Sequence, residues 1–239
     1  MKHSIVLCLV VLAAALLVSC GNGEGTLTVA TYPVPGEVII DGTSQGEAPV
    51  IVTLKEGTHN VSFSAYSEQY ITPHTRTVRV EKGTSMSITG EYRNRFIPAE
   101  SPQGFSLADS LRVYGTSERK LKDGTIFDYI NGGALIYLKY GLRETTHALF
   151  RDGESNEILI DIFDMVTFEN AQAAFEDNEI CPDGFEPCNF GMGCKFYSHE
   201  PDFFLYFYKS RYLVFVSTTN DLLKDRVFTF AASIEKRIF

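Results

Sequence analysis

The sequence predicts two folding units: a small all-β sandwich, followed by an α+β domain whose antiparallel sheet is covered by helices. Three observations support this prediction. Between residues 26 and 92, short runs rich in β-branched residues alternate with turns that contain Gly, Pro and Asp. Between residues 105 and 239, segments with helical periodicity alternate with strand-like segments. Residues 93–104 contain two prolines and lack a sustained period, so we expect a linker there.

The overall composition is that of a globular protein, with 44% hydrophobic and 21% charged residues in a chain of 239. Lys and Arg number 21 against 30 Asp and Glu, so the formal net charge is −9. Proteins that bind nucleic acids usually carry a basic surface, and this acidic balance therefore argues against a nucleic-acid partner.

The first twenty residues indicate export from the cytoplasm. Lys2 precedes an almost wholly apolar run over residues 5–18, which is the pattern of a signal peptide and is short for a membrane-spanning helix. The run ends in LVSCG, residues 17–21, which resembles the bacterial lipobox. The resemblance implies that residues 1–20 hold a lipoprotein signal, that Cys20 carries acyl chains such as palmitate, and that residues 21–25 form a flexible tether.

The same resemblance implies a place in the cell envelope. In Gram-negative lipoproteins, an aspartate directly after the lipidated cysteine favours retention in the inner membrane, and here that position is Gly21. We therefore expect the outer membrane, facing the periplasm, if the source is Gram-negative. Otherwise the expected place is the outer face of the cytoplasmic membrane.

Three cysteines, Cys181, Cys188 and Cys194, remain beyond the signal segment. Outside the cytoplasm a disulfide is expected, and three thiols allow one bridge and leave one free. A bridge from Cys181 to Cys188 would close a turn-rich loop, while the pairs Cys188–Cys194 and Cys181–Cys194 also stay open. With His199 these thiols could bind zinc, but the spacing lacks the close cysteine pairs of structural zinc sites, so no metal is expected.

Six strands are expected in the first unit, over residues 26–32, 37–40, 50–54, 58–66, 75–80 and 85–92. The runs PGEVIIDG (35–42), GEAP (46–49) and LKEGTHNV (54–61) resemble the PEGA domain, a small β-sandwich of bacterial surface and envelope proteins. The resemblance implies a spacer or a binding platform for residues 26–92, not an enzyme.

The second unit, residues 105–239, is expected to combine helices with an antiparallel sheet. Apolar positions gather on one helical face in residues 126–140, 168–175 and 222–238. Strands are expected near residue 114 and over residues 145–150, 158–163, 194–198, 203–208 and 212–218. The aromatic run 203–208 is apolar on both faces, which predicts a strand covered on both sides or one that lines a partner groove.

The segment FDYINGGA, residues 127–134, resembles the signature of an uncharacterised bacterial family, and ILIDIFDM (158–165) matches that family's next strand. The resemblance names no activity. Two glycines inside a helix are unfavourable, so these residues should have a compensating role. One such role is a candidate ligand or partner site that comprises Tyr129, Asn131, Gly132 and Gly133, with backbone N–H groups and the Asn amide facing outward. The structural alternative is that Asn131 caps a helix break and the glycines permit close packing.

Catalytic motifs such as G-x-S-x-G, H-E-x-x-H and a phosphate-binding loop are absent from the sequence. Asp161 and Asp164 should point to opposite faces of a strand, which argues against paired catalytic carboxylates. No cofactor and no catalytic residue is expected. The leading hypothesis is a membrane-anchored envelope lipoprotein that acts as a non-enzymatic binding or scaffold module for an envelope protein or cell-wall component. The alternative is a small periplasmic enzyme or small-molecule receptor with a pocket at the turn 131–133.

Overall fold

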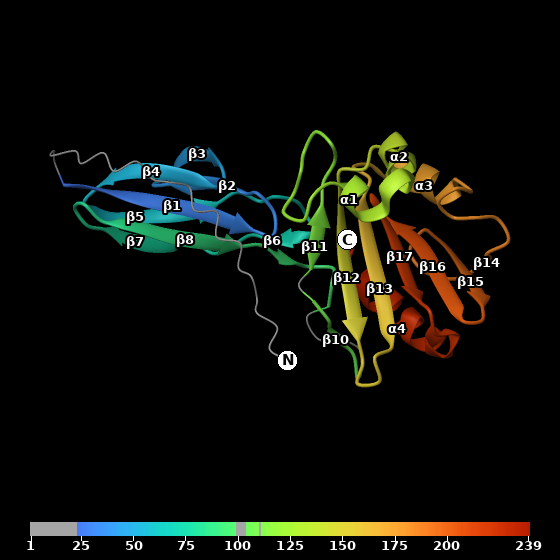
Figure 1. The fold of residues 1–239 in the computed structure, drawn as a ribbon. Coiled ribbons are helices and arrows are strands. Elements are labelled where there is room, and N and C mark those ends of the chain that lie inside the picture. Colours follow the sequence, from blue (N-terminus) through green and yellow to red (C-terminus); the bar gives the residue numbers. More distant parts are fainter. Residues whose placement is uncertain (1–22, 99–103, 110) are drawn as a thin grey trace.

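The structure is a computed structural model that describes residues 23–98, 104–109 and 111–239. The chain is rich in β-strands, which form separate sheets in its N-terminal and C-terminal parts (Figure 1). The expected signal peptide and Cys20 lie outside the described residues.

The N-terminal part consists of two sheets that share one core. One sheet has the strand order β4-β1-β8 and the other β3-β2-β5-β7. Leu27 and Val29 of the first sheet are buried in one cluster with Val38 and Val61 of the second. The strands are β1 (Glu24–Tyr32), β2 (Glu37–Ile40), β3 (Thr43–Glu47), β4 (Val50–Lys55), β5 (Gly57–Phe63), β7 (Arg76–Val80) and β8 (Ser85–Glu91). This arrangement matches the expected sandwich, with β3 added.

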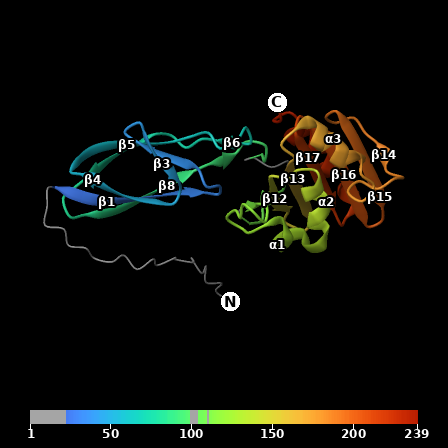
Figure 2. The same cartoon turned by 90° about the horizontal axis from the view of Figure 1, so that it is seen from above.

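The segment expected to be a linker begins with packed residues. Strand β6 (Tyr70–Ile71) pairs with β9 (Arg93–Asn94), and both lie where the two parts of the chain meet (Figures 1 and 2). Phe96 and Ile97 are then buried in the core of the C-terminal sheet. The ring of Phe96 stands 4.8 Å from that of Tyr212, so the first residues after β9 hold the two parts together.

The C-terminal part is an antiparallel sheet with the order β10-β12-β13-β17-β16-β15-β14, and β11 also pairs with β12. Its strands are β10 (Ser106–Leu107), β11 (Arg112–Tyr114), β12 (Glu144–Arg151), β13 (Glu157–Asp164), β14 (Glu186–Pro187), β15 (Gly193–His199), β16 (Asp202–Lys209) and β17 (Tyr212–Thr218). The strands expected from periodicity are all present, and β10 and β14 are additional short strands.

Helices cover both faces of this sheet, as the sequence predicts. On one face, α4 (Lys224–Glu235) buries Val227 and Phe230 against Ile160 of β13. On the other face, Ile126 and Phe175 share a core with Phe163. These contacts come from α1 (Ile126–Ile130), α2 (Ala134–Lys139) and α3 (Phe168–Glu176). Figure 1 shows α1, α2 and α3 gathered at one end of the strands.

The expected helix 126–140 is broken into α1, a single 3-10 turn η1 (Asn131–Gly133), and α2. Asn131 has a φ of +49°, outside the helical region, and this residue marks the break. Gly141, with a φ of +74°, follows α2 and allows the chain to leave the helix. The last helix is shorter than expected, because the turn η2 (Asp221–Leu223) precedes α4.

Candidate functional site: an aromatic groove

Side chains of five neighbouring strands form cross-strand rows on the face that α1, α2 and α3 cover in part. The register aligns one row as Lys195, Tyr206, Phe215, Asp161 and His147, taken from β15 to β12. The next row comprises Tyr197, Phe204, Ser217, Leu159 and Leu149. The helices pack over residues at the other end of the strands, such as Phe163 and Leu213. Phe204 and Phe215 are therefore only partly buried.

A groove of about 440 Å³ lies over this partly covered end of the sheet. Its floor is formed by strand residues and one wall by the segment that follows α3, and the lining residues are Glu179, Ile180, Pro182, Phe185, Tyr197, Phe204, Tyr206 and Phe215. Five of these residues are aromatic. In the aromatic run 203–208, Phe203, Leu205 and Phe207 are buried in the core with α4, whereas Phe204 and Tyr206 line the groove and Tyr208 is buried beside α3.

The aromatic rings of the groove contact one another in a continuous group. Phe185 and Tyr197 stack with ring centroids 5.2 Å apart, and Tyr197 stacks on Phe204 at 6.1 Å. Tyr206 and Phe215 lie 4.5 Å apart. Such pairs stabilise one another and hold their ring faces in fixed directions. The groove floor is therefore a preformed aromatic surface.

The chain around the groove is strongly acidic. Residues 176–202 carry one lysine and seven acidic residues, namely Glu176, Asp177, Glu179, Asp183, Glu186, Glu200 and Asp202. Tyr140 donates a hydrogen bond to Asp177, and this bond is the largest cause that lowers the Asp177 pKa to about 2. The lysine, Lys195, has its Nζ atom 5.0 Å from the centre of the Phe175 ring. The surroundings of the groove thus have a net negative charge at neutral pH.

A partly buried polar cluster lies next to the groove in the same cross-strand row. Tyr129 donates a hydrogen bond to Asp161 Oδ2 over 2.8 Å, and His147 Nδ1 lies 2.9 Å from Asp161 Oδ1. The ring of Tyr129 stacks on Tyr114 with centroids 4.9 Å apart. Burial raises the pKa of Asp161, since it disfavours the charged carboxylate.

This cluster has the features of a structural group. Burial is also the main cause that raises the pKa of Tyr129, so its phenol stays protonated and donates to Asp161 at neutral pH. A hydroxyl fixed in that way is a poor nucleophile or base. Sequence reasoning placed Tyr129 in a site but did not join it to His147 and Asp161. An acidic residue within the apolar strand 158–163 was the available signal.

The structure separates the predicted site residues. Tyr129 points inward to the polar cluster, whereas Asn131, Gly132 and Gly133 are exposed on η1 and are not among the residues that line the groove. The close-packing explanation of the glycines is wrong, because a Cβ atom added to either would have no neighbour within 4 Å. Asn131 does stand at the helix break, as the structural alternative expected.

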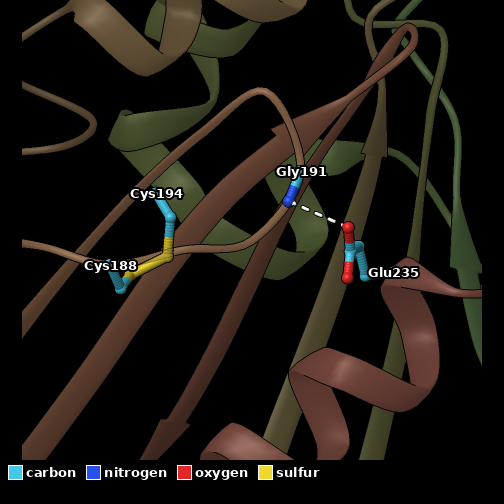
Figure 3. The surroundings of a disulfide bond; sticks show 4 residues. All are labelled: Cys188, Gly191, Cys194 and Glu235. Carbon is cyan, nitrogen blue, oxygen red and sulfur yellow. Dashed lines mark hydrogen bonds between the residues drawn. A yellow bond between two sulfur atoms is a disulfide. The ribbon is translucent and has the colours of Figure 1, made fainter.

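The disulfide joins Cys188 to Cys194, one of the pairings left open, and not Cys181 to Cys188 (Figure 3). Strands β14 and β15 pair antiparallel, and the next position along this pairing places Cys188 opposite Cys194. The Cys188 N–H donates to the Cys194 carbonyl over 3.1 Å. Within the enclosed loop, Gly191 N–H donates to Glu235 of α4 over 3.3 Å, which ties the loop to that helix (Figure 3).

Cys181 is a free cysteine, and it is buried in the core beside α3. Burial raises the pKa of its thiol to about 11, so the thiolate is scarce at neutral pH. The disulfide occupies the sulfur atoms of Cys188 and Cys194, so these two thiols are not free to bind zinc with His199. Among the described residues, no group of three or more His, Cys, Asp or Glu side chains is placed to hold a metal ion.

Comparison with known proteins identifies the N-terminal part. The family model of the PEGA domain matches residues 24–95, which include both sheets of the N-terminal core and the pair β6-β9. Neither the curated proteins nor the solved structures contain a match to the chain. In the described part of the chain, no helix has the length and apolar character needed to cross a bilayer. Residues 24–95 are therefore a PEGA domain, consistent with an extracellular or periplasmic binding module.

Proposed function

We propose that the protein is a lipid-anchored envelope protein that binds an envelope protein or a cell-wall component through the aromatic groove. One observation carries this proposal: five aromatic side chains line a partly exposed groove of about 440 Å³ beside the helices that cover this face of the sheet. Ligand sites are concave, mostly apolar, and contain few polar groups. The groove has this character, with Glu179 as its charged lining residue.

The position of the PEGA domain supports a spacer role. Strand β1 begins at the end of the PEGA domain that is remote from the C-terminal sheet (Figures 1 and 2). Its other end is at Tyr32, whose ring lies 4.5 Å from Lys122 Nζ of the C-terminal part. A strand rises about 3.3 Å per residue, so β1 alone spans about 30 Å. An acyl anchor on Cys20 would therefore leave the PEGA domain between the membrane and the groove.

The enzyme or receptor alternative depended on a pocket at the turn 131–133. That turn is exposed, and the groove is lined by other residues. The polar cluster of Tyr129, His147 and Asp161 is internally hydrogen-bonded, and its carboxylate is buried. Binding without turnover accounts for these features more simply than catalysis does.

In-cell photo-crosslinking tests the binding function. A photoreactive benzoylphenylalanine would replace Phe204 in the groove, and a matched control would replace Ile51, which is 62% exposed on the PEGA domain. We expect one reproducible adduct at position 204 that is missing at position 51, with its identity given by mass spectrometry. If both positions give the same adducts, the groove is not the binding surface.

Membrane fractionation tests the anchor separately. Cys20→Ala should move the protein from the membrane fraction to the soluble fraction, because each buried acyl methylene contributes about 0.8 kcal/mol to membrane binding. A Cys20→Ala variant that stays with the membranes after a salt wash would contradict the anchor. This result would leave the binding function of the groove untouched.

A further inference from the structure

We infer that the groove recognises a cation: a lysine or arginine side chain on an exposed basic segment of a partner protein. This inference rests on the proposed binding function and specifies the chemistry of the ligand. It follows from the combination of an aromatic floor, an acidic lining residue and an acidic surrounding chain.

The aromatic floor can bind a cation through the faces of its rings, without a buried salt bridge. The face of an aromatic ring carries partial negative charge, so an ammonium or guanidinium group is attracted to it. Tyr197 is 36% exposed and stacks between Phe185 and Phe204, while Tyr206 and Phe215 extend the floor. An arginine side chain can lie flat on such a surface, with its apolar stem over one ring and its guanidinium over the next.

The protein already uses this interaction at the edge of the same row. Lys195 lies beside Tyr206 in the register and extends over the ring of Phe175, with Nζ 5.0 Å from the ring centre. Among the residues that line the groove there is an acid, Glu179, and no basic side chain. The cationic position over the groove rings is therefore open to a group from outside the chain.

The acidic chain around the groove selects the sign of the ligand charge. Residues 176–202 contain seven acidic residues and one lysine, and this is a large share of the net charge of −9 carried by the whole chain. Such a field attracts basic segments and repels acidic ones. The groove is open along the sheet, and the aromatic residues extend over neighbouring strands, which suits an extended segment with several side chains.

A neutral sugar or a purely apolar segment fits the lining less well. Sugars need several hydrogen-bonding side chains, and the polar side-chain groups here are the Glu179 carboxylate and the hydroxyls of Tyr197 and Tyr206. An apolar segment would cover Glu179 without giving its carboxylate a partner, which is unfavourable. A basic segment satisfies the carboxylate and the rings together.

Two peptides of equal shape and different charge test the inference. The full chain in detergent would be titrated into a fluorescein-labelled octapeptide of alternating arginine and alanine, and into the same peptide with citrulline in place of arginine. We expect the arginine peptide to bind about tenfold more tightly. This preference should weaken between 50 and 500 mM salt, because salt screens the acidic surroundings.

Matched variants locate the interaction. Tyr197→Leu and Phe204→Leu keep an apolar side chain but remove the ring face, so each should weaken arginine-peptide binding several-fold and leave citrulline-peptide binding unchanged. Glu179→Gln should weaken binding of the arginine peptide and leave binding of the citrulline peptide unchanged. Ile51→Ala, on the exposed surface of the PEGA domain, is the control and should bind like the parent protein.

The outcomes separate this inference from the proposed function. Equal binding of both peptides, or equal loss of both in Phe204→Leu, would overturn cation recognition in favour of an apolar surface. Loss of the adduct at position 204 when a neutral cell-wall oligosaccharide is present during irradiation, but not when the arginine peptide is present, would overturn it in favour of a sugar. In both cases a specific adduct at position 204 would still uphold the groove as a binding site. Without that adduct, the proposed function fails as well.

Discussion

The junction between the PEGA domain and the C-terminal sheet is organised around the hydroxyl of Thr146 in β12. Gln69 Nε2 donates to Thr146 Oγ1 over 2.7 Å, and the Tyr70 hydroxyl lies 3.2 Å from the same atom. Thr146 and Gln69 are fully buried, and Tyr70 is 2% exposed. Asn94 Nδ2 completes the group with a long bond of 3.4 Å. The Thr146 hydroxyl oxygen therefore lies within hydrogen-bond distance of three side chains of the PEGA domain.

Thr146→Val replaces that hydroxyl with a methyl group of nearly equal size. It removes two good hydrogen bonds and leaves the Gln69 amide N–H and the Tyr70 hydroxyl buried without this partner. A buried polar group without a partner costs about 1–3 kcal/mol. Because relaxation can reconnect one of the two groups, we expect a loss of about 2–4 kcal/mol in the free energy of unfolding.

Thr145→Val is the matched control on the same strand. Thr145 is also fully buried, but its Oγ1 has no hydrogen-bond partner among the described residues. Thr145→Val removes a buried hydroxyl that makes no hydrogen bond with the described residues. The free energy of unfolding should therefore be unchanged or higher by about 1 kcal/mol. The two neighbouring substitutions, identical in chemistry, thus have opposite expected signs.

Urea unfolding of the full chain in detergent, followed by circular dichroism, measures both variants. The Thr146→Val transition should lie at lower urea concentration and separate into two steps as the PEGA domain loses its contacts. Substitutions at surface positions usually change the free energy of unfolding by less than about 0.5 kcal/mol. A decrease smaller than this in Thr146→Val, or equal decreases in both variants, would refute the role of the Thr146 hydroxyl.

Three further predictions concern other parts of the chain. Cys188→Ser should lower the free energy of unfolding by about 2 kcal/mol, the chain-entropy value for so short a loop, and reductant should lower the parent protein's urea midpoint equally. Burial raises the pKa of Glu144 above its ordinary value of 4.5, so the folded state retains a proton that the unfolded state releases. Stability should therefore fall as pH rises above about 4.5. Glu144→Gln should reduce the slope of the free energy of unfolding against pH, measured by urea unfolding, by up to about 1.4 kcal/mol per pH unit. Gly133, with a helical φ of −66° and open space around it, should accept alanine, and Gly133→Ala should raise the melting temperature by about 1–4 °C.

Much of the sheet structure could be predicted because burial leaves a period of two in the sequence. Strand β2 follows residues 37–40 as expected, and Val38 and Ile40 alternate with exposed or half-buried neighbours. Strand β3 could not be predicted in this way, since its five residues are nearly all exposed and carry no apolar period. Phe96 and Ile97 were missed because two prolines close by gave the segment the character of a linker.

The candidate site depended more strongly on tertiary structure. The run 203–208 showed that one strand has apolar residues on both faces. The groove accounts for Phe204 and Tyr206 on one of these faces. The wall from Phe185 and Pro182 depends on how the segment after α3 folds back, and no local pattern encodes that path. The disulfide partner of Cys188 likewise follows from the pairing of β14 with β15, which sequence spacing alone does not determine.

The rigidity of the junction determines how the groove would meet a partner. Besides the bonds to Thr146, the Tyr66 hydroxyl donates to Glu144 over 2.7 Å, and Arg119 binds Glu47 of the PEGA domain over 3.1 Å. With these contacts the PEGA domain and the sheet should move as one body, so the groove would stand at a nearly fixed height above the anchor. A weakened junction should then separate two properties. The Thr146→Val protein should keep its affinity for the arginine peptide in solution, because the groove is untouched, and should lose crosslinking at position 204 in cells, because the groove no longer stands at that height.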